Sequence, residues 1–224
     1  MARDGWPFVI GGLFVTAIGA FLGATGAGAW YILAAAGGVA TFFFVFFFRD
    51  PARTAPTGNH AIVAPADGRI VSVTTRPDGG VQIDTFLSVF NVHVNRAPTA
   101  GRVISTDYRP GRFIAAMKPE AGRQNERQDI VMRNDVGIIR FAQIAGVLAR
   151  RIVCRVGEGD ELKVGDRIGM IRFGSRMEVI LPPGFDAAVT VGEKVRAGET
   201  VIARYGRQTD DRQEEDARAG LATS

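Results

Sequence analysis

The first fifty residues of the chain contain an unbroken segment without a charged side chain, which runs from Gly5 to Phe48. A helix that crosses a lipid bilayer needs roughly 20 consecutive apolar residues, so this segment is long enough for two such helices. We expect them over residues 6–24 and 27–48, joined by a short turn of small residues. The sequence therefore predicts a helical membrane hairpin over residues 1–50.

A cleaved signal peptide is the alternative interpretation of this segment. A signal peptide has one short apolar core, which is followed by a cleavage site and a polar chain. Here the apolar residues continue through Trp30 and Tyr31 into a phenylalanine-rich run, which favours the hairpin. Arg3 precedes the first helix, and Arg49 and Arg53 follow the second. Because positive residues stay on the cytoplasmic side of a membrane, we expect the rest of the chain to lie on that side of the cell membrane.

Charge and cysteine content narrow the class of protein. The 224 residues include 27 Lys and Arg against 23 Asp and Glu, which gives a net charge of +4. This mild, scattered excess suits a surface that meets anionic lipid headgroups, and no basic stripe points to a nucleic-acid partner. Cys154 is the only cysteine, so no intrachain disulfide can form, in keeping with a reducing compartment.

After a turn-rich linker over residues 51–59, the segment 60–207 shows short apolar runs that are separated by Gly, Pro, Asp and Asn. Such runs are typical of strands, and no long amphipathic helix is evident. Residues 156–168 and 189–201 resemble each other, each with two glycine turns around a short strand. We therefore expect a mainly β domain, a compact β sandwich that resembles the hammerhead motifs of biotinyl and lipoyl domains. The polar tail over 208–224 lacks apolar periodicity, and we expect it to be disordered.

The pair Gly174–Ser175 is the first candidate for chemistry. Apolar runs over 170–173 and 177–181 predict strands on either side of a tight turn. A Gly-Ser pair is most often only a turn. Because glycine has no Cβ atom, however, the approach of the Ser175 hydroxyl to the Gly174 carbonyl is unhindered. Such an arrangement allows the chain to cut itself and to convert the serine into a pyruvoyl group.

His93 is the second candidate, and one of only two histidines in the chain. It lies in the alternating segment 91–95, which predicts a strand with Asn91, His93 and Asn95 on one polar face. An imidazole on such a face can move protons near neutral pH. The other histidine, His60, is expected in an exposed loop.

Asp67 is the third candidate. Its Asp-Gly context is a hairpin turn signal, and turn chemistry alone explains it. The alternative is a carboxylate that orients an imidazole or takes a proton from a hydroxyl group. The sequence leaves both interpretations open.

Taken in order, these positions resemble the phosphatidylserine decarboxylase family in its short bacterial form, over nearly the whole chain. The motifs that carry the resemblance are the apolar N-terminus, Phe48-Arg-Asp-Pro51, Ala64-Pro-Ala-Asp-Gly68, Asn91-Val-His-Val-Asn-Arg-Ala-Pro98, Asn125-Glu-Arg127 and Phe173-Gly-Ser-Arg176. The resemblance implies a proenzyme that cuts itself between Gly174 and Ser175 into chains 1–174 and 175–224. It also implies a pyruvoyl group at Ser175, which forms a Schiff base with phosphatidylserine and yields phosphatidylethanolamine without a metal ion.

One position departs from the longer relatives in that family, which carry two histidines three residues apart in the middle motif. His93 stands at the first place and Arg96 at the second. The resemblance gives His93 the role of proton donor in decarboxylation. The self-cleavage role of the second histidine is either unfilled or shared by His93 and Asp67. Asn95 and Arg96 become candidates for binding the substrate.

Two alternatives stay open from the sequence. A membrane-anchored adaptor with a lipoyl-like β domain would explain the anchor and the repeat, but it would leave the Gly174–Ser175 pair and His93 without a purpose. The same decarboxylase could instead act on a serine phospholipid with a different tail, such as archaetidylserine, because the chemistry involves only the headgroup.

Overall fold

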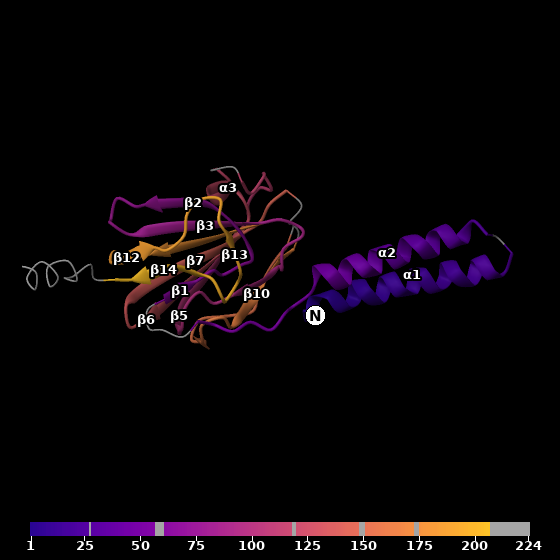
Figure 1. The fold of residues 1–224 in the computed structure, drawn as a ribbon, viewed down its shortest axis with the longest axis horizontal. Helices are drawn as coiled ribbons and strands as arrows, with labels where there is room; N and C mark the ends of the chain where they lie inside the picture. Colours follow the sequence, from indigo (N-terminus) through magenta and orange to yellow (C-terminus); the bar gives the residue numbers. More distant parts are fainter. Residues whose placement is uncertain (27, 57–60, 118–119, 148–150, 173–174, 207–224) are drawn as a thin grey trace, which may run out of the picture.

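Two antiparallel helices project from one end of a β domain in the computed structural model, which describes residues 1–26, 28–56, 61–117, 120–147, 151–172 and 175–206 (Figure 1). A short 3-10 turn, Arg3–Gly5, leads into α1, Trp6–Ala24, and α2 follows over Trp30–Phe47. The two apolar helices predicted from the sequence are confirmed, although the second begins at Trp30 rather than at residue 27. Both the entry and the exit of the hairpin lie at the β domain (Figure 1).

Glycine residues let the two helices approach each other closely. A Cβ atom on Gly19 would lie 2.5 Å from the backbone nitrogen of Ala34, and one on Gly37 would lie 2.8 Å from the backbone nitrogen of Thr16. In lipid, where the hydrophobic effect does not hold helices together, close contacts of small residues are a main source of helix association. The hairpin is therefore a packed pair that does not need the β domain to cover it.

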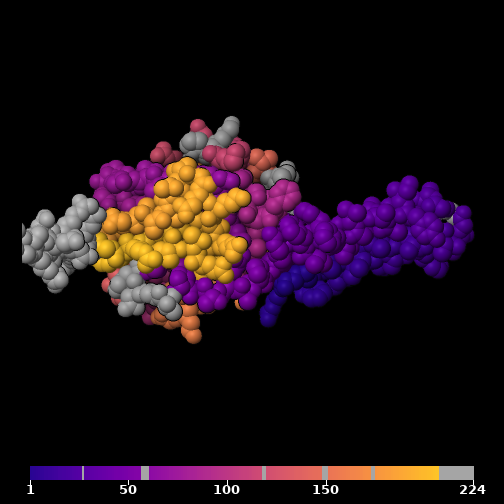
Figure 2. All heavy atoms as spheres, in the orientation of Figure 1, coloured from indigo at the N-terminus to yellow at the C-terminus, as the bar shows by residue number. Residues whose placement is uncertain are grey.

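The outer surface of the hairpin is apolar, and no other part of the chain covers it on the face shown in Figure 2. The large exposed apolar side chains on it are Trp6, Ile10, Leu13, Phe14, Val15, Ile18, Phe21, Trp30, Tyr31, Ile32, Leu33, Val39, Phe42, Phe43, Val45 and Phe46. At 1.5 Å per residue each helix is about 28 Å long, close to the roughly 30 Å hydrocarbon core of a bilayer. Length and hydropathy thus suggest that the hairpin associates with a membrane.

An eight-stranded antiparallel sheet forms the body of the β domain and curls into a half-barrel (Figure 1). Its strand order is β13-β2-β3-β11-β7-β6-β5-β9, and two three-stranded sheets, β1-β14-β12 and β4-β10-β8, share one hydrophobic core with it. The bounds are β1 Ala61–Val63, β2 Gly68–Thr75, β3 Val81–Leu87, β4 Val94–Arg96, β5 Gly101–Arg109, β6 Arg127–Asn134, β7 Gly137–Ile144, β8 Arg151–Cys154, β9 Glu161–Leu162, β10 Arg167–Arg172, β11 Ser175–Leu181, β12 Phe185–Ala187, β13 Lys194–Val195 and β14 Val201–Tyr205. Outside the hairpin, the described residues contain one short helix, α3, Ala121–Gln124. The predicted mainly β architecture is confirmed.

The β domain contains an internal repeat that is larger than the sequence analysis recognised. Residues 63–72, Val-Ala-Pro-Ala-Asp-Gly-Arg-Ile-Val-Ser, match residues 96–105, Arg-Ala-Pro-Thr-Ala-Gly-Arg-Val-Ile-Ser. The first copy pairs with the segment around β13 and β14, and the second with the segment around β9 and β10. Equivalent backbone hydrogen bonds recur in both copies: Val63 N to Pro98 O and Arg96 N to Pro65 O, Ile70 N to Glu193 O and Val103 N to Asp160 O, Gly198 N to Ala64 O and Gly165 N to Ala97 O. Two copies of one supersecondary unit are therefore related by an approximate two-fold axis.

A second, smaller apolar cluster joins the hairpin to the domain. It consists of Phe47 and Phe48 at the end of the hairpin with Val92, Val94 and Met170 of the β domain. All five side chains are nearly or fully buried. The base of the hairpin is consequently packed into the domain rather than linked to it by a free tether.

Candidate active site

Ser175 is the first residue of β11, a strand near the centre of the large sheet. Its backbone pairs with Leu87 of β3, and its side chain is fully buried. Because side chains alternate along a strand, Ser175 faces the same side as Met177, which belongs to the core. The Ser175 Oγ atom has no hydrogen-bond partner among the described residues. Gly174, the other half of the predicted cleavage pair, lies outside the described residues.

Three further polar side chains share this inner face. Thr85 of β3 and Gln143 of β7 both pair with Met177, one on each side of β11, and both are buried. The Gln143 Nε2 atom donates to the Asn95 Oδ1 atom over 2.8 Å. The Thr85 Oγ1, Gln143 Oε1 and Asn95 Nδ2 atoms are left without partners among the described residues. Diagonal neighbours across an antiparallel pair lie about 7–8 Å apart, which puts this unfilled hydrogen-bonding capacity within reach of Ser175.

Such a gathering of unpaired polar atoms is unusual, because each buried one costs about 1–3 kcal/mol. It marks a place where a ligand or water completes the network. The sequence analysis missed Thr85 and Gln143. For Gln143 a signal was available: the other inner positions of its strand region, Ile139, Phe141 and Ala145, are apolar, so a glutamine among them breaks the pattern.

The His93 imidazole is fully buried immediately before β4. Its ring centroid lies 4.1 Å from that of Phe47, the last residue of α2, at an interplanar angle of 33°. Burial lowers the pKa of His93 to about 4; the Asn91 backbone opposes this shift, and the nearby Arg49 charge adds to it. His93 is therefore neutral at pH 7, able to accept a proton and poor at donating one.

The strand predicted over residues 91–95 is wrong in its first part, because β4 begins only at Val94. The Asn91 Oδ1 atom accepts hydrogen bonds from both the backbone N–H and the hydroxyl group of Ser88, over 2.9 and 2.7 Å. This local turn removes Asn91 from the extended conformation. His93 consequently lies in the interior, against the base of the hairpin, rather than on a polar strand face.

The structure does not bring Asp67 together with Ser175. Asp67 directly precedes β2, and β3 lies between β2 and β11, so two strand spacings of roughly 4.8 Å separate the two residues. The Asp67 carboxylate accepts hydrogen bonds from Arg53 Nη2, over 2.9 and 3.1 Å, and from the Ala197 backbone N–H, over 2.8 Å. Its described partners thus belong to the linker and to a turn.

The internal repeat removes the turn explanation of Asp67. Ala100 occupies the equivalent position in the second copy, where the corresponding backbone hydrogen bonds form without a carboxylate. Forming this turn therefore does not require an aspartate. Within the described residues, the carboxylate contacts Arg53 and the Ala197 backbone N–H.

Arg96 is a second departure from the repeat, since Val63 occupies its place in the first copy. The Arg96 guanidinium donates to the Asp50 carboxylate over 3.1 Å and to the carbonyl oxygens of Pro51 and Gly165 over 3.0 and 2.9 Å. Only 7% of the side chain is exposed. Arg96 therefore ties the exit of the hairpin to the β domain.

The fold and the site together define a class of protein: a membrane-associated enzyme of mainly β structure with a buried serine on the inner face of its central sheet. His60 lies outside the described residues. Within them, no group of three or more His, Cys, Asp or Glu side chains is placed to hold a metal ion.

Comparison with known proteins gives the particular family. The family model of phosphatidylserine decarboxylase matches residues 40–203. The phosphatidylserine decarboxylase proenzyme of Pelobacter propionicus is 41% identical over 213 residues, which cover 92% of this chain and 97% of that protein. The proenzyme of Cupriavidus metallidurans is 44% identical over 210 residues, which cover 91% and 94%. The chain belongs to the phosphatidylserine decarboxylase family. This confirms the family, the decarboxylase activity and the pyruvoyl cofactor that were predicted from the sequence.

Burial of a neutral His93 predicts a contribution to stability that is lost in acid. The His93 pKa falls from 6.5 to about 4 on folding, so between these pH values only the unfolded chain binds the proton. The contribution of His93 to the free energy of unfolding should therefore decrease as the pH falls through this range, by about 3 kcal/mol. We expect His93→Phe, made in an uncleaved Ser175→Ala background, to remove this contribution, so that the stability of the variant rises relative to that of the background protein as the pH falls in denaturant titrations.

Comparing the Ser175→Ala protein with and without His93→Phe separates the titration of His93 from that of Asp84. Burial raises the pKa of Asp84 to about 6, which acts in the opposite direction in both proteins. Equal slopes between pH 4 and 6.5 with and without His93 would contradict the buried, neutral imidazole.

Proposed function

We propose that Ser175 is the source of the pyruvoyl group with which this chain converts phosphatidylserine to phosphatidylethanolamine. The observation that carries this proposal is the fully buried Ser175 hydroxyl at the start of β11, which has no hydrogen-bond partner in the part of the chain that the structure describes. A serine that only served the turn would hydrogen-bond to a nearby backbone group. Once formed, the group supplies an electron sink for the electron pair that departing CO2 leaves behind. The unfilled polar atoms of the inner face fit a reactive carbonyl at this position.

Self-cleavage requires a base for the Ser175 hydroxyl. Its oxygen attacks the Gly174 carbonyl carbon, the peptide C–N bond breaks, and an ester and a free amine result. Loss of the Cα proton of residue 175 then expels the Gly174 carboxylate, and water converts the remaining enamine to a ketone and ammonia. His93 and Asp67 are our candidates to share the role of this base, so that loss of His93 alone should leave cleavage at least in part.

Asp67 is our second participant in self-cleavage, as a carboxylate that orients the base or takes the proton itself. Its carboxylate lies 2.9 Å from the Arg53 guanidinium. To act on Ser175, the carboxylate must leave Arg53 and approach β11. The dispensability of a carboxylate at the equivalent Ala100 supports a chemical rather than a structural reason for Asp67.

In decarboxylation His93 acts in the opposite direction, as the donor that protonates the carbon from which CO2 has left. A neutral imidazole is unsuited to this task at pH 7. The substrate headgroup brings a carboxylate and a phosphate, and negative charge beside an imidazole raises its pKa. We infer that substrate binding charges His93, which lets the imidazole donate this proton in turnover.

The neutral polar atoms around Ser175 are suited to recognising a serine headgroup. The free Asn95 Nδ2 donor suits the substrate carboxylate, and the Gln143 Oε1 and Thr85 Oγ1 acceptors suit its ammonium group. Arg96, the other candidate for binding the substrate, follows Asn95 in β4 and donates to Asp50 over 3.1 Å. None of these groups reads the tail, so archaetidylserine remains a second candidate substrate.

The lipid headgroup reaches this site, in the same proposal, past an apolar groove on the surface. The groove has a volume of about 260 Å³, and its lining includes Phe86, Val89, Ala116, Met117 and Val147. Ser88, which also lines the groove, follows Leu87, the residue that pairs with Ser175, so the groove lies at the end of the sheet where β11 begins. The acyl chains can therefore stay in the bilayer while only the headgroup enters.

The finer organisation belongs to the same proposal. We place a spanning hairpin over residues 1–50, a linker over 51–59 and a catalytic domain of hammerhead-like sandwich type over 60–207, with its two halves related by the internal repeat. The arginines that flank the hairpin favour the cytoplasmic side for the domain. The cleaved chains 1–174 and 175–224 remain partners, and both stay at the cell membrane.

Purified protein should consist of chains 1–174 and 175–224, the second with a blocked N-terminus. Ser175→Ala should remain one chain without decarboxylase activity, because no hydroxyl group is left to attack. Intact mass under denaturing conditions measures both. The control is Ser105→Ala, which alters an exposed serine of β5 and should cleave normally. A single uncut chain in active wild-type protein would end the proposal and favour a non-catalytic adaptor.

His93→Ala and Asp67→Ala should separate the two reactions. We expect His93→Ala to cleave at least in part and to lose decarboxylation by roughly 10²–10⁴-fold, the usual range for a positioned acid–base group. Asp67→Ala should slow cleavage, and Ala100 in the repeat indicates that its turn will still form. Gels follow cleavage, labelled CO2 follows turnover, and Asp78→Ala at an exposed turn is the control. Normal cleavage of Asp67→Ala would remove Asp67 from the mechanism.

Gln143→Leu tests headgroup recognition apart from self-cleavage. It removes one acceptor and leaves Asn95 without its partner, so we expect kcat/KM for phosphatidylserine to fall about tenfold or more while cleavage proceeds. Gln128→Leu is the matched control, since Gln128 is a buried glutamine that pairs with Gln143 on the neighbouring strand. Equal kinetics of the two variants would show that Gln143 does not contact the substrate.

A further inference from the structure

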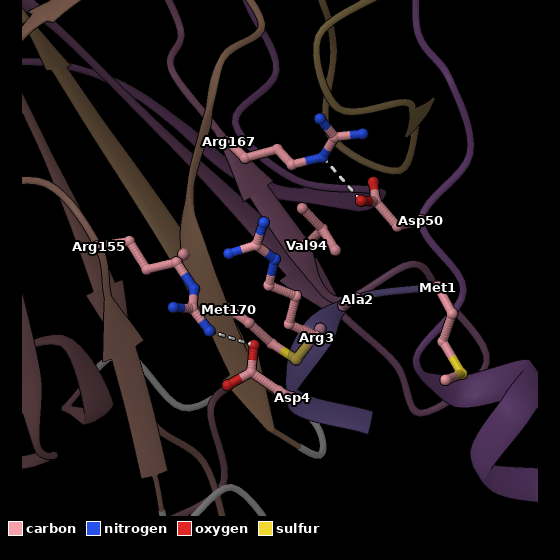
Figure 3. A pocket seen from close by; sticks show the side chains of 10 residues that line it. Met1, Ala2, Arg3, Asp4, Asp50, Val94, Arg155, Arg167 and Met170 are labelled. Carbon is pink, nitrogen blue, oxygen red and sulfur yellow. Dashed lines mark hydrogen bonds and ion pairs between the residues drawn. The ribbon is translucent and has the colours of Figure 1, made fainter. Parts of the chain in front are cut away.

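A second pocket lies at the base of the hairpin, on the side of the N-terminus (Figure 3). Its volume is about 360 Å³. Residues 1–4 form one wall, Asp50 of the linker forms another, and β4 and β10 close it from the domain side. The pocket is therefore built from three parts of the chain that meet only at this junction.

Arginine dominates the charge around this pocket. Four guanidinium groups share two carboxylates: Arg155 and Arg172 contact Asp4, and Arg96 and Arg167 contact Asp50. A fifth, that of Arg3, has no ion-pair partner among the described residues. In Figure 3 the Arg3 side chain extends into the space between Arg155 and Arg167. The cluster carries three uncompensated positive charges, which attract an anion into the pocket.

The position of the pocket indicates which anion. It lies where the apolar helices meet the polar domain, since one part of its lining, residues 1–4, precedes α1 and another, Asp50, follows α2. A hairpin of bilayer length places this level at the lipid headgroups. Arginine binds phosphate with paired donors, and its long side chain suits the interface.

The pocket is separate from the candidate active site. Val94 and Met170, which line it, belong to the apolar cluster at the hairpin base, together with Phe47. Phe47 in turn stacks on His93. The apolar cluster thus stands between the pocket and His93, and a phosphate held by Arg3 and Arg167 belongs to a different lipid molecule from the one whose headgroup reaches His93.

We propose that this pocket binds the phosphate group of an anionic phospholipid that is not the molecule being decarboxylated, through Arg3, Arg155 and Arg167. The inference rests on the proposed membrane insertion of the hairpin, but not on the chemistry assigned to Ser175 or His93. A lipid bound there fixes the height and tilt of the β domain on an anionic membrane.

Native mass spectrometry of the mature two-chain protein in detergent tests the proposal, with short-chain phosphatidylglycerol as the probe. This lipid is anionic and has no amine to react, so its binding is independent of decarboxylation. We expect phosphatidylglycerol to bind at least about tenfold more tightly than phosphatidylcholine. Arg3→Gln combined with Arg167→Gln should lose this preference, whereas Arg76→Gln combined with Arg102→Gln, two arginines remote from the pocket, should keep it.

Three results would overturn the proposal. They are equal binding of the two lipids by the wild-type protein, unchanged binding of phosphatidylglycerol by the double pocket variant, and displacement of the lipid by millimolar inorganic phosphate, which would make the pocket a free-anion site. Arg3→Gln alone guards against misfolding, because Arg3 has no described ion pair to lose; it should weaken phosphatidylglycerol binding with an unchanged melting temperature. A mature wild-type protein that prefers phosphatidylglycerol to phosphatidylcholine but does not decarboxylate phosphatidylserine would instead count against the proposed function.

Discussion

The guanidinium group of Arg96 holds together the parts on which the site depends. It is nearly buried, and it joins the hairpin exit, through Asp50 and Pro51, to the turn at Gly165 where the two repeats meet. Breaking a buried ion pair by removing one partner typically costs about 3–5 kcal/mol, since the other charge stays behind. The register between anchor and domain is therefore fixed, and with it the contact of Phe47 with His93.

A second ion network holds the opposite face of the sheet. Arg127 and Arg176 lie among the acidic side chains of Asp84, Asp129 and Glu178, all on the side of the sheet away from Ser175. Arg127 also donates to the Gly122 carbonyl over 2.6 Å, which fastens the segment around α3 to the sheet. The charged face is thus structural, whereas the neutral face with unpaired polar atoms is the one suited to a substrate.

The sequence predicted those features that depend on neighbouring residues, and it did not predict those that depend on contacts between distant segments. The helices followed from the absence of charge between Gly5 and Phe48, and Ser175 from its glycine neighbour and the family resemblance. The burial of His93 could not be predicted, because it depends on the Ser88–Asn91 turn and on Phe47, a residue of a distant helix. The pairing of Arg96 with Asp50 joins positions far apart in the sequence, which no local pattern reveals.

The central place of β11 has a mechanical consequence for a chain that divides at its first residue. The strand pairs with β3 along seven residues and with β7 along five. A chain that starts at Ser175 is therefore hydrogen-bonded on both sides to strands of the N-terminal chain. Further on, β14 lies between β1 and β12. Cleavage of the backbone at this point therefore frees a new chain end, while the sheet pairings on both sides keep the two pieces in one fold.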